Sequence, residues 1–233
     1  MTVVTVYAHR GASVAERENT VAAFRRAREL GADGVELDVR RAADGALVVH
    51  HDAHLADGRA IHELRAADLP PEVPLLDAAL DACAGMVVNV EIKNWPQDVD
   101  FDPGQALVPP VLEACRGHDV LISSFNIATV DRVRELDASV PTAWLVSFAP
   151  DRDRAGRLVE MCRRHGHEVL HPHELAVDAH LLGLCRAAGI AVNTWTVDDP
   201  ARMRVLADLG VDGIVTNVPD VALAALGREP AAG

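Results

Sequence analysis

Short apolar runs alternate with longer helix-like segments along the whole sequence. Eight of these runs are rich in β-branched residues: VVTVYA, GVELDV, MVVNVEI, VLISSF, TAWLVS, EVLHP, AVNTWTV and GIVTN. Their apolar character is nearly continuous, which is typical of strands in a parallel sheet that is covered on both faces. Most of the segments between them end in glycine, as RARELG and LADLG do. Glycine often ends a helix because it adopts the left-handed conformation without strain.

This alternation predicts a TIM (β/α)8 barrel. Eight strands, each followed by a helix, in a chain of 233 residues match the strand count and the size of that fold. A doubly wound open sheet is the main alternative, but it usually has fewer strands, and the sequence lacks the GxGxxG fingerprint. We therefore expect a single α/β barrel domain over residues 1–233. The alternation of strand-like and helix-like segments is interrupted at residues 46–74, so we expect a compact insertion there, after the second strand.

The charge balance restricts the partners. The chain has 22 Lys and Arg against 35 Asp and Glu, and its formal net charge is −13. Nucleic acids and anionic membranes are bound by basic surfaces, so we expect neither as a partner. An anionic small molecule remains possible, because it needs only local positive charge or a metal ion. The sequence leaves the oligomeric state open.

The sequence predicts a cytoplasmic protein without stable membrane association. Its start, MTVVTVYAHRG, lacks a basic region followed by a long apolar segment, as a signal peptide would have. A membrane span would need a run of about 18 apolar residues, and none occurs. The cysteines have no CxxC spacing, so we expect them to be small core residues: Cys83, Cys115, Cys162 and Cys185.

Acidic side chains stand at the ends of two predicted strands. In GVELDV, Glu36 and Asp38 share a face because side chains along a strand alternate with a period of two. Glu91 and Lys93 share a face in NVEIKN, one strand over. A single acidic strand end is often a solvated rim or a salt bridge, but carboxylates on adjacent strands favour a cation site. Three carboxylates without Cys or His indicate a hard ion, Mg²⁺ or Ca²⁺, rather than Zn²⁺.

Histidines stand beside these carboxylates in the predicted barrel. His9 and Arg10 end the first strand, and His50 and His51 follow the second. Together with Lys93 and a cation they suit phosphoryl chemistry, because positive groups stabilise charge on the phosphate oxygens. One histidine can remove a proton from the nucleophile while another protonates the leaving oxygen. In an extended segment His50 points away from His51, so we leave it outside the chemistry.

The other histidines are weaker candidates. His171 and His173 of HPH end the sixth predicted strand, where they could form a metal pair or a polar rim with one ring facing the pocket. The remaining histidines are expected at the surface: His54, His62, His118, His165, His167 and His180.

In their order along the chain, these motifs resemble the glycerophosphodiester phosphodiesterase family. The resemblance runs from residue 6 to about residue 222 and is carried by HRGAS, ENT, GADGVELDV, DGALVVHHDAHL, VEIK, SSFN, WTVDDP and GVDGIVTNVPD. It implies a TIM barrel that uses a divalent cation to hydrolyse glycerophosphodiesters to sn-glycerol 3-phosphate and an alcohol. In the implied mechanism the neighbouring glycerol hydroxyl attacks phosphorus, and water then opens the cyclic phosphate.

The resemblance also implies a role for each residue at a matching position. These residues are the acid–base pair His9 and His51, the metal ligands Glu36, Asp38 and Glu91, the phosphate-binding Arg10 and Lys93, the loop-ordering Glu18 and Asn19, and Phe125 and Trp195 of the alcohol pocket. Which histidine is the acid and which is the base is left open, as is the identity of the alcohol.

Two features depart from the family pattern. HDAHLADGRAIHELRAADLPPEVP lacks the family's basic, threonine-rich stretch and its longer insertion, so we expect a more open mouth. Asn217 stands where aspartate is common, and we expect a modest change at the rim from it.

Three other functions are considered beside the hydrolase. A phospholipase D-like lyase would stop at the cyclic phosphate, and a non-catalytic barrel would only bind phosphodiesters. A sugar-phosphate isomerase would need a glycine-rich phosphate site after the seventh and eighth strands, and TNVPDVALAALG does not offer one.

Overall fold

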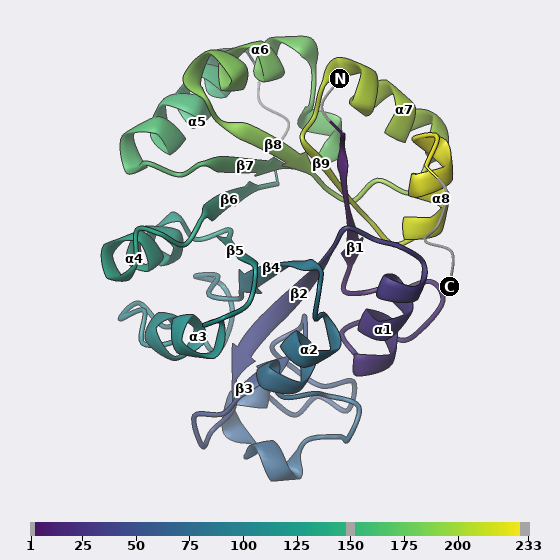
Figure 1. Cartoon of the computed structure of the whole chain (residues 1–233). Coiled ribbons are helices and arrows are strands. Elements are labelled where there is room, and N and C mark those ends of the chain that lie inside the picture. The colour runs from purple at the N-terminus through teal and green to yellow at the C-terminus, as the bar shows by residue number, and fades with distance from the viewer. Residues whose placement is uncertain (1–2, 148–151, 229–233) are drawn as a thin grey trace.

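The eight predicted strands close into a barrel. A computed structural model describes residues 3–147 and 152–228, and in it the helices surround a closed sheet (Figure 1). The barrel strands are β1 (Thr5–His9), β2 (Gly34–Arg41), β4 (Val87–Ile92), β5 (Val120–Ser124), β6 (Thr142–Val146), β7 (Val169–Pro172), β8 (Ala191–Thr194) and β9 (Gly213–Thr216). Each is parallel to both neighbours, and β1 pairs with β9 and with β2, which closes the sheet. The TIM-barrel prediction is confirmed.

The α-helices of the described residues lie outside the sheet (Figure 1). They are α1 (Val21–Glu29), α2 (Leu76–Ala82), α3 (Val108–Ala114), α4 (Ile127–Leu136), α5 (Arg152–His165), α6 (Ala179–Ala188), α7 (Pro200–Leu209) and α8 (Pro219–Ala225). Three short 3-10 turns accompany them: η1 (Ile61–Glu63), η2 (Ala66–Asp68) and η3 (Glu174–Ala176). Within residues 3–147 and 152–228, no helix is long and apolar enough to cross a membrane.

The helix ends follow from local sequence. Among the described residues, four helices begin after a side chain that accepts a hydrogen bond from a backbone N–H of the first turn, namely Thr20, Asn126, Asp178 and Asp199. Each such cap satisfies one of the N–H groups that have no partner inside the helix. Gly189 and Gly210 end α6 and α7 with φ angles of 71° and 90°, in the left-handed conformation that the sequence pattern predicted.

Alternate residues of β2 face opposite sides of the barrel wall. Val35, Leu37 and Val39 are fully buried and belong to a hydrophobic cluster between the sheet and the helices. Burial of aliphatic side chains of this size contributes roughly 1.5–3 kcal/mol each. Because strand side chains alternate, Glu36 and Asp38 point the other way, into the barrel. The packing of the outer face therefore fixes the direction of the two carboxylates.

A second hydrophobic cluster fills the opposite side of the barrel, around the last four helices. The cysteines lie in these two clusters, and all four are buried and unpaired: Cys83, Cys115, Cys162 and Cys185. Their prediction as small core residues is confirmed.

The predicted insertion after β2 contains a strand that the sequence analysis did not predict. β3 (Leu47–Val49) pairs antiparallel with β2 at the edge of the barrel. An apolar run of this length is too short for periodicity to distinguish a strand from a loop. The pairing continues beyond β3, where the backbone N–H of His50 donates to the Asp38 carbonyl at 2.9 Å. This hydrogen bond brings His51 to the mouth of the barrel.

Candidate active site

The carboxyl ends of the first barrel strands bring the predicted site residues together. The register places His9 beside Glu36 across β1 and β2, and Asp38 beside Glu91 across β2 and β4. Lys93 directly follows β4. Neighbouring strands lie about 4.8 Å apart, so side chains in register are close neighbours. In TIM barrels this end of the sheet carries the active site.

Glu36, Asp38 and Glu91 form a buried carboxylate cluster. They are 4%, 1% and 7% exposed, and one oxygen of each lies within 4.8 Å of the others. Burial, and then the like charges of the other two, raise the pKa of Glu36 well above its ordinary value. Burial also raises the pKa of Glu91. Burial acts on Asp38 in the same direction, but Lys93 and Arg10 outweigh it and hold the pKa of Asp38 well below its usual range.

Two basic side chains partly neutralise this cluster. Lys93 Nζ lies 2.8 Å from Glu91 Oε1 and 3.4 Å from Asp38 Oδ1. Arg10 Nε lies 3.3 Å from Asp38 Oδ2, and the Arg10 backbone N–H donates to Glu36 Oε2 at 3.0 Å. Two cations against three carboxylates leave a net negative charge when all three are ionised. The cluster therefore attracts a further cation.

The loop after β1 is held by the two residues expected to order it. Arg10 Nη1 donates to both carboxylate oxygens of Glu18 at 3.0 Å, and the Asn19 backbone N–H donates to the Arg10 carbonyl at 2.9 Å. The Asn19 side chain also donates to Asp38 Oδ2 at 2.7 Å, so it contacts the carboxylate cluster directly. Gly11 turns the chain with φ 81°, and a Cβ at Gly11 would lie 2.6 Å from the α1 backbone.

His9 is oriented by a residue that follows the last barrel strand. His9 Nδ1 lies 2.7 Å from Asn217 Oδ1. Asn217 Nδ2 donates to Asp198 at 2.7 Å, which directs the Asn217 oxygen towards the ring. This network assigns the proton to His9 Nδ1 and leaves a lone pair on Nε2, which lies 3.9 Å from Glu36 Oε2. Burial, and then the charge of Arg10, lower the pKa of His9 and favour this neutral form.

His51 reaches the mouth from the insertion. Its Nδ1 lies 2.7 Å from Asp52 Oδ1, and its side chain is 35% exposed. The Nε of Arg40 donates to the His51 carbonyl at 2.9 Å. Arg40 is itself buried and forms ion pairs with Asp98 and Asp100. A buried ion-pair network, which the sequence analysis did not identify, therefore fixes the backbone at His51.

His9 and His51 line one cavity of about 210 Å³, together with Arg10 and Lys93. Phe125 and Trp195 line the same cavity, and their rings meet edge to face with centroids 5.5 Å apart. An adjoining cavity of about 310 Å³ shares His51, Lys93 and Phe125 with the first. The cavity thus combines charged, polar and aromatic lining residues, which suits a ligand with an anionic part and a less polar part.

The HPH motif contributes one histidine to the smaller cavity. His171 lines it and is buried, and burial lowers the pKa of His171 to about 3. His173 instead accepts a hydrogen bond from the Leu175 backbone at the start of η3. Its ring packs edge to face against Trp195 with centroids 5.2 Å apart. These contacts fit the polar-rim interpretation rather than a metal pair.

Three further residues have roles at the site that were not predicted from the sequence. Asn217 was expected only to modify the rim, yet it provides the hydrogen bond to His9. Asn89 lines the cavity from β4, two residues before Glu91, and strand alternation could have placed it on the same face. Trp95 extends the aromatic wall towards Phe125 with centroids 5.5 Å apart, and no short-range pattern indicated it.

Comparison with known proteins assigns the chain to a family. Residues 9–221 match the sequence profile of the glycerophosphoryl diester phosphodiesterase family. The chain belongs to this family. A glycerophosphodiester phosphodiesterase of Caldanaerobacter subterraneus subsp. tengcongensis is 33% identical, and the match covers 92% of this chain and 94% of that protein. The resemblance seen in the sequence is confirmed, and the chain is an enzyme of the phosphoric diester hydrolase class.

Solved structures of family members have the same fold. A phosphodiesterase of Oleispira antarctica, in complex with the product sn-glycerol-3-phosphate, superposes with a TM-score of 0.86 at 25% identity over 97% of this chain and 98% of that one. A glycerophosphodiester phosphodiesterase of Thermotoga maritima superposes with a TM-score of 0.79 at 27% identity, again over 97% and 98% of the two chains.

Proposed function

We propose that this chain hydrolyses glycerophosphodiesters to sn-glycerol 3-phosphate and an alcohol with the help of a divalent cation, Mg²⁺ or Ca²⁺. The supporting observation is the meeting of three buried carboxylates, two basic side chains and two histidines at one barrel mouth. The Oleispira antarctica enzyme, which holds sn-glycerol-3-phosphate, supports the same product here.

The carboxylate cluster fits a hard divalent cation. Asp38 Oδ1 is buried and accepts no hydrogen bond from the described residues. An ion beside it would also relieve the repulsion that contributes to the raised pKa of Glu36. Mg²⁺ and Ca²⁺ prefer carboxylate oxygens, so Glu36, Asp38 and Glu91 are the proposed ligands. When bound, the ion supplies positive charge to the phosphate oxygens.

The walls of the cavity provide the proposed substrate contacts. Arg10 and Lys93 line it with their cationic groups held beside the carboxylates, where they would bind the two free phosphate oxygens. Phe125 and Trp195 line the same cavity and would contact the alcohol. Glu18 and Asn19 would keep Arg10 in place through the hydrogen bonds described above.

Hydrogen bonds distinguish the proposed roles of the two histidines. His9 has its lone pair on Nε2, so we assign it as the base that removes the proton from the glycerol hydroxyl beside the phosphodiester. That oxygen attacks phosphorus, and the bond from phosphorus to the alcohol oxygen breaks. His51, beside the Asp52 carboxylate, gives its proton to the departing oxygen. Water then opens the cyclic phosphate as His51 takes its proton and His9 protonates the ring oxygen.

Phosphorus NMR tests the proposed reaction directly. Chelator-treated protein would be incubated with glycerophosphocholine, with and without Mg²⁺ or Ca²⁺, and the glycerol 3-phosphate signal followed in time. We expect conversion only with added metal, and a loss of about 10³-fold or more in the Glu91→Gln variant. Glu113→Gln on α3, whose side chain is 68% exposed, is the matched control and should react normally.

The same spectra distinguish the alternatives. A cyclic phosphate that accumulates and persists would indicate a lyase. Absence of turnover for every diester and metal, with diester binding retained, would indicate a binding protein. Metal-independent conversion, or normal conversion by Glu91→Gln, would contradict the proposed cation site.

A further inference from the structure

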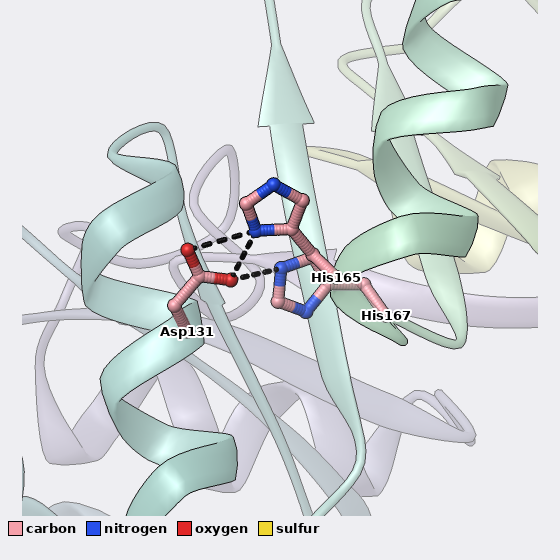
Figure 2. Close-up of side chains that lie close together, drawn as sticks. All are labelled: Asp131, His165 and His167. Carbon is pink, nitrogen blue, oxygen red and sulfur yellow. Dashed lines mark hydrogen bonds and ion pairs between the residues drawn. The ribbon is translucent and has the colours of Figure 1, made fainter.

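A second cluster of metal-ligating side chains lies outside the barrel, between α4 and the turn that joins α5 to β7 (Figure 2). Asp131 belongs to α4, His165 is the last residue of α5, and His167 follows two residues later. Figure 2 shows both imidazole rings facing the Asp131 carboxylate. His165 Nδ1 lies 2.8 and 2.9 Å from the two carboxylate oxygens, and His167 Nε2 lies 3.1 Å from Oδ1.

The cluster is half buried. His165 and His167 were both expected at the surface. His165 is exposed, as expected, but the His167 side chain is fully buried, so the expectation for His167 was wrong. The His165 and Asp131 side chains are 38% and 30% exposed. Gly166 causes the difference, because its φ of 76° reverses the chain after α5 and turns the next residue inward. One face of the cluster is therefore fixed in the protein, and the other is open to ions in solution.

Neighbouring residues orient the buried ring. Thr142 Oγ1 lies 3.0 Å from His167 Nδ1 and 3.1 Å from Glu168 Oε2. When the Thr142 hydroxyl donates to Glu168, it accepts from His167 Nδ1–H, and the lone pair on Nε2 then points at Asp131 Oδ1. A cation between Nε2 and this oxygen removes the repulsion between their lone pairs. Metal-bound histidines are typically held in this way through their other ring nitrogen.

The surroundings also suit a cation. Arg134 is the one base among these contacts, and it is paired with Glu168. Asp131 and Glu168 outnumber Arg134, so the fixed charges that contact the two rings are net negative.

We propose that Asp131, His165 and His167 form a second metal site that binds a transition-metal ion such as Zn²⁺. Two imidazole nitrogens and one carboxylate oxygen match the preference of Zn²⁺, whereas Mg²⁺ and Ca²⁺ prefer oxygen ligands. Ligand atoms around tetrahedral Zn²⁺ lie about 3.4 Å apart, given bonds of about 2.1 Å. The present spacings of 2.8–3.1 Å to Asp131 therefore need to open by only a few tenths of an ångström, and water completes the shell.

This site would act on stability and leave catalysis unchanged. It links α4 to the turn before β7, near the amino ends of the strands, whereas the proposed chemistry lies at their carboxyl ends. A bound ion would replace the hydrogen bond between His165 and Asp131 by coordinate bonds. Since the metal binds the folded chain in preference to the unfolded one, it raises the melting temperature as its concentration rises.

The test uses zinc as the probe on the full chain, with Mg²⁺ present in excess to occupy the barrel mouth. We expect isothermal titration to give one Zn²⁺ per chain, and 100-fold saturation to raise Tm by about 5 °C or more. His165→Gln and Asp131→Asn should lose both effects and keep the Mg²⁺-supported activity. His180→Gln, a change at an exposed histidine of α6, should retain both.

Each variant is compared with and without zinc, so any loss of intrinsic stability does not affect the result. Equal zinc binding and an equal Tm rise in the wild type and in His165→Gln would overturn the proposal. Zinc binding that is abolished by Glu36→Gln and retained in Asp131→Asn would overturn it as well, because the ion would then lie at the barrel mouth.

Discussion

The two candidate metal-binding clusters of this barrel are built in opposite ways. At the mouth, Glu36, Asp38 and Glu91 are all buried and lie on adjacent strands in register. On the outside, Asp131 and His165 come from separate helices and are partly exposed. Carboxylates alone indicate a hard ion, and mixed imidazole and carboxylate ligands indicate a transition metal. The type of ligand atom and the element that carries it, rather than proximity alone, therefore decide which ion each cluster could bind.

The electrostatic state of the two clusters also differs. At the mouth the carboxylates repel one another, and the pKa of Glu36 is raised well above its ordinary value. Outside, Asp131 is the one carboxylate of its cluster, and the His165 ring can donate to it. Repulsion between carboxylates therefore destabilises the mouth without a cation, whereas the outer cluster has no such repulsion within it.

The largest expected effect is a loss of activity when the histidines at the barrel mouth are replaced, but not when His165 of the outer cluster is replaced. His9→Gln and His51→Gln should each lower the hydrolysis of glycerophosphocholine by about 10²–10⁴-fold, while His165→Gln should stay within about twofold. The nitrophenyl diester of glycerol 3-phosphate sharpens this prediction, because nitrophenolate leaves without a proton. Release of nitrophenolate should then be restored in His51→Gln and remain low in His9→Gln. If nitrophenolate release were restored in His9→Gln instead, His9 would be the acid and His51 the base.

A smaller effect should appear in thermal unfolding of metal-free protein. The folded-state pKa of Glu36 is raised, so its stabilising contribution is present at low pH and is lost as pH rises through that pKa. Glu36→Gln removes the charge and should raise Tm at pH 8 by about 3 °C, with little change at pH 4. Asp131→Asn should lower Tm, since it weakens the hydrogen bond from the His165 ring. A lower Tm for Glu36→Gln at pH 8 would show that repulsion among the three carboxylates does not destabilise the metal-free protein.

The smallest effect is expected at Asn217. His9 Nδ1 lies 2.7 Å from Asn217 Oδ1, so Asn217→Asp would place a negative charge beside the ring. An adjacent carboxylate raises the pKa of a histidine. Because His9 must be unprotonated to act as the base, the acidic limb of the kcat/KM profile should shift to higher pH. At pH 8 the rate should change by about threefold or less. A profile that does not shift would mean that His9 does not control this limb.

The barrel strands and the site residues that they carry could be predicted from the sequence, because their positions depend on local periodicity. The alternation in GVELDV and NVEIKN places Glu36, Asp38 and Glu91 on inner faces, and the order of parallel strands then brings them together. The short strand β3 could not be recognised, because three apolar residues carry no periodicity.

The contacts that could not be predicted from the sequence depend on packing between segments that are distant along the chain. Asn217 and His9 are 208 residues apart, and Asp131 and His167 are 36 apart. The burial of His167 depends on the turn at Gly166 and on the position of α4. No pattern in the sequence around His167 specifies where a neighbouring helix will lie.

The most direct test of the central claim is anomalous X-ray scattering from crystals soaked in Mn²⁺, a reporter for hard-ion sites. We predict one manganese peak within coordination distance of Glu36, Asp38 and Glu91, and its loss in Glu36→Gln crystals. A mouth that holds no manganese at saturating concentration, in crystals of active protein, would contradict the claim that these carboxylates bind the cation.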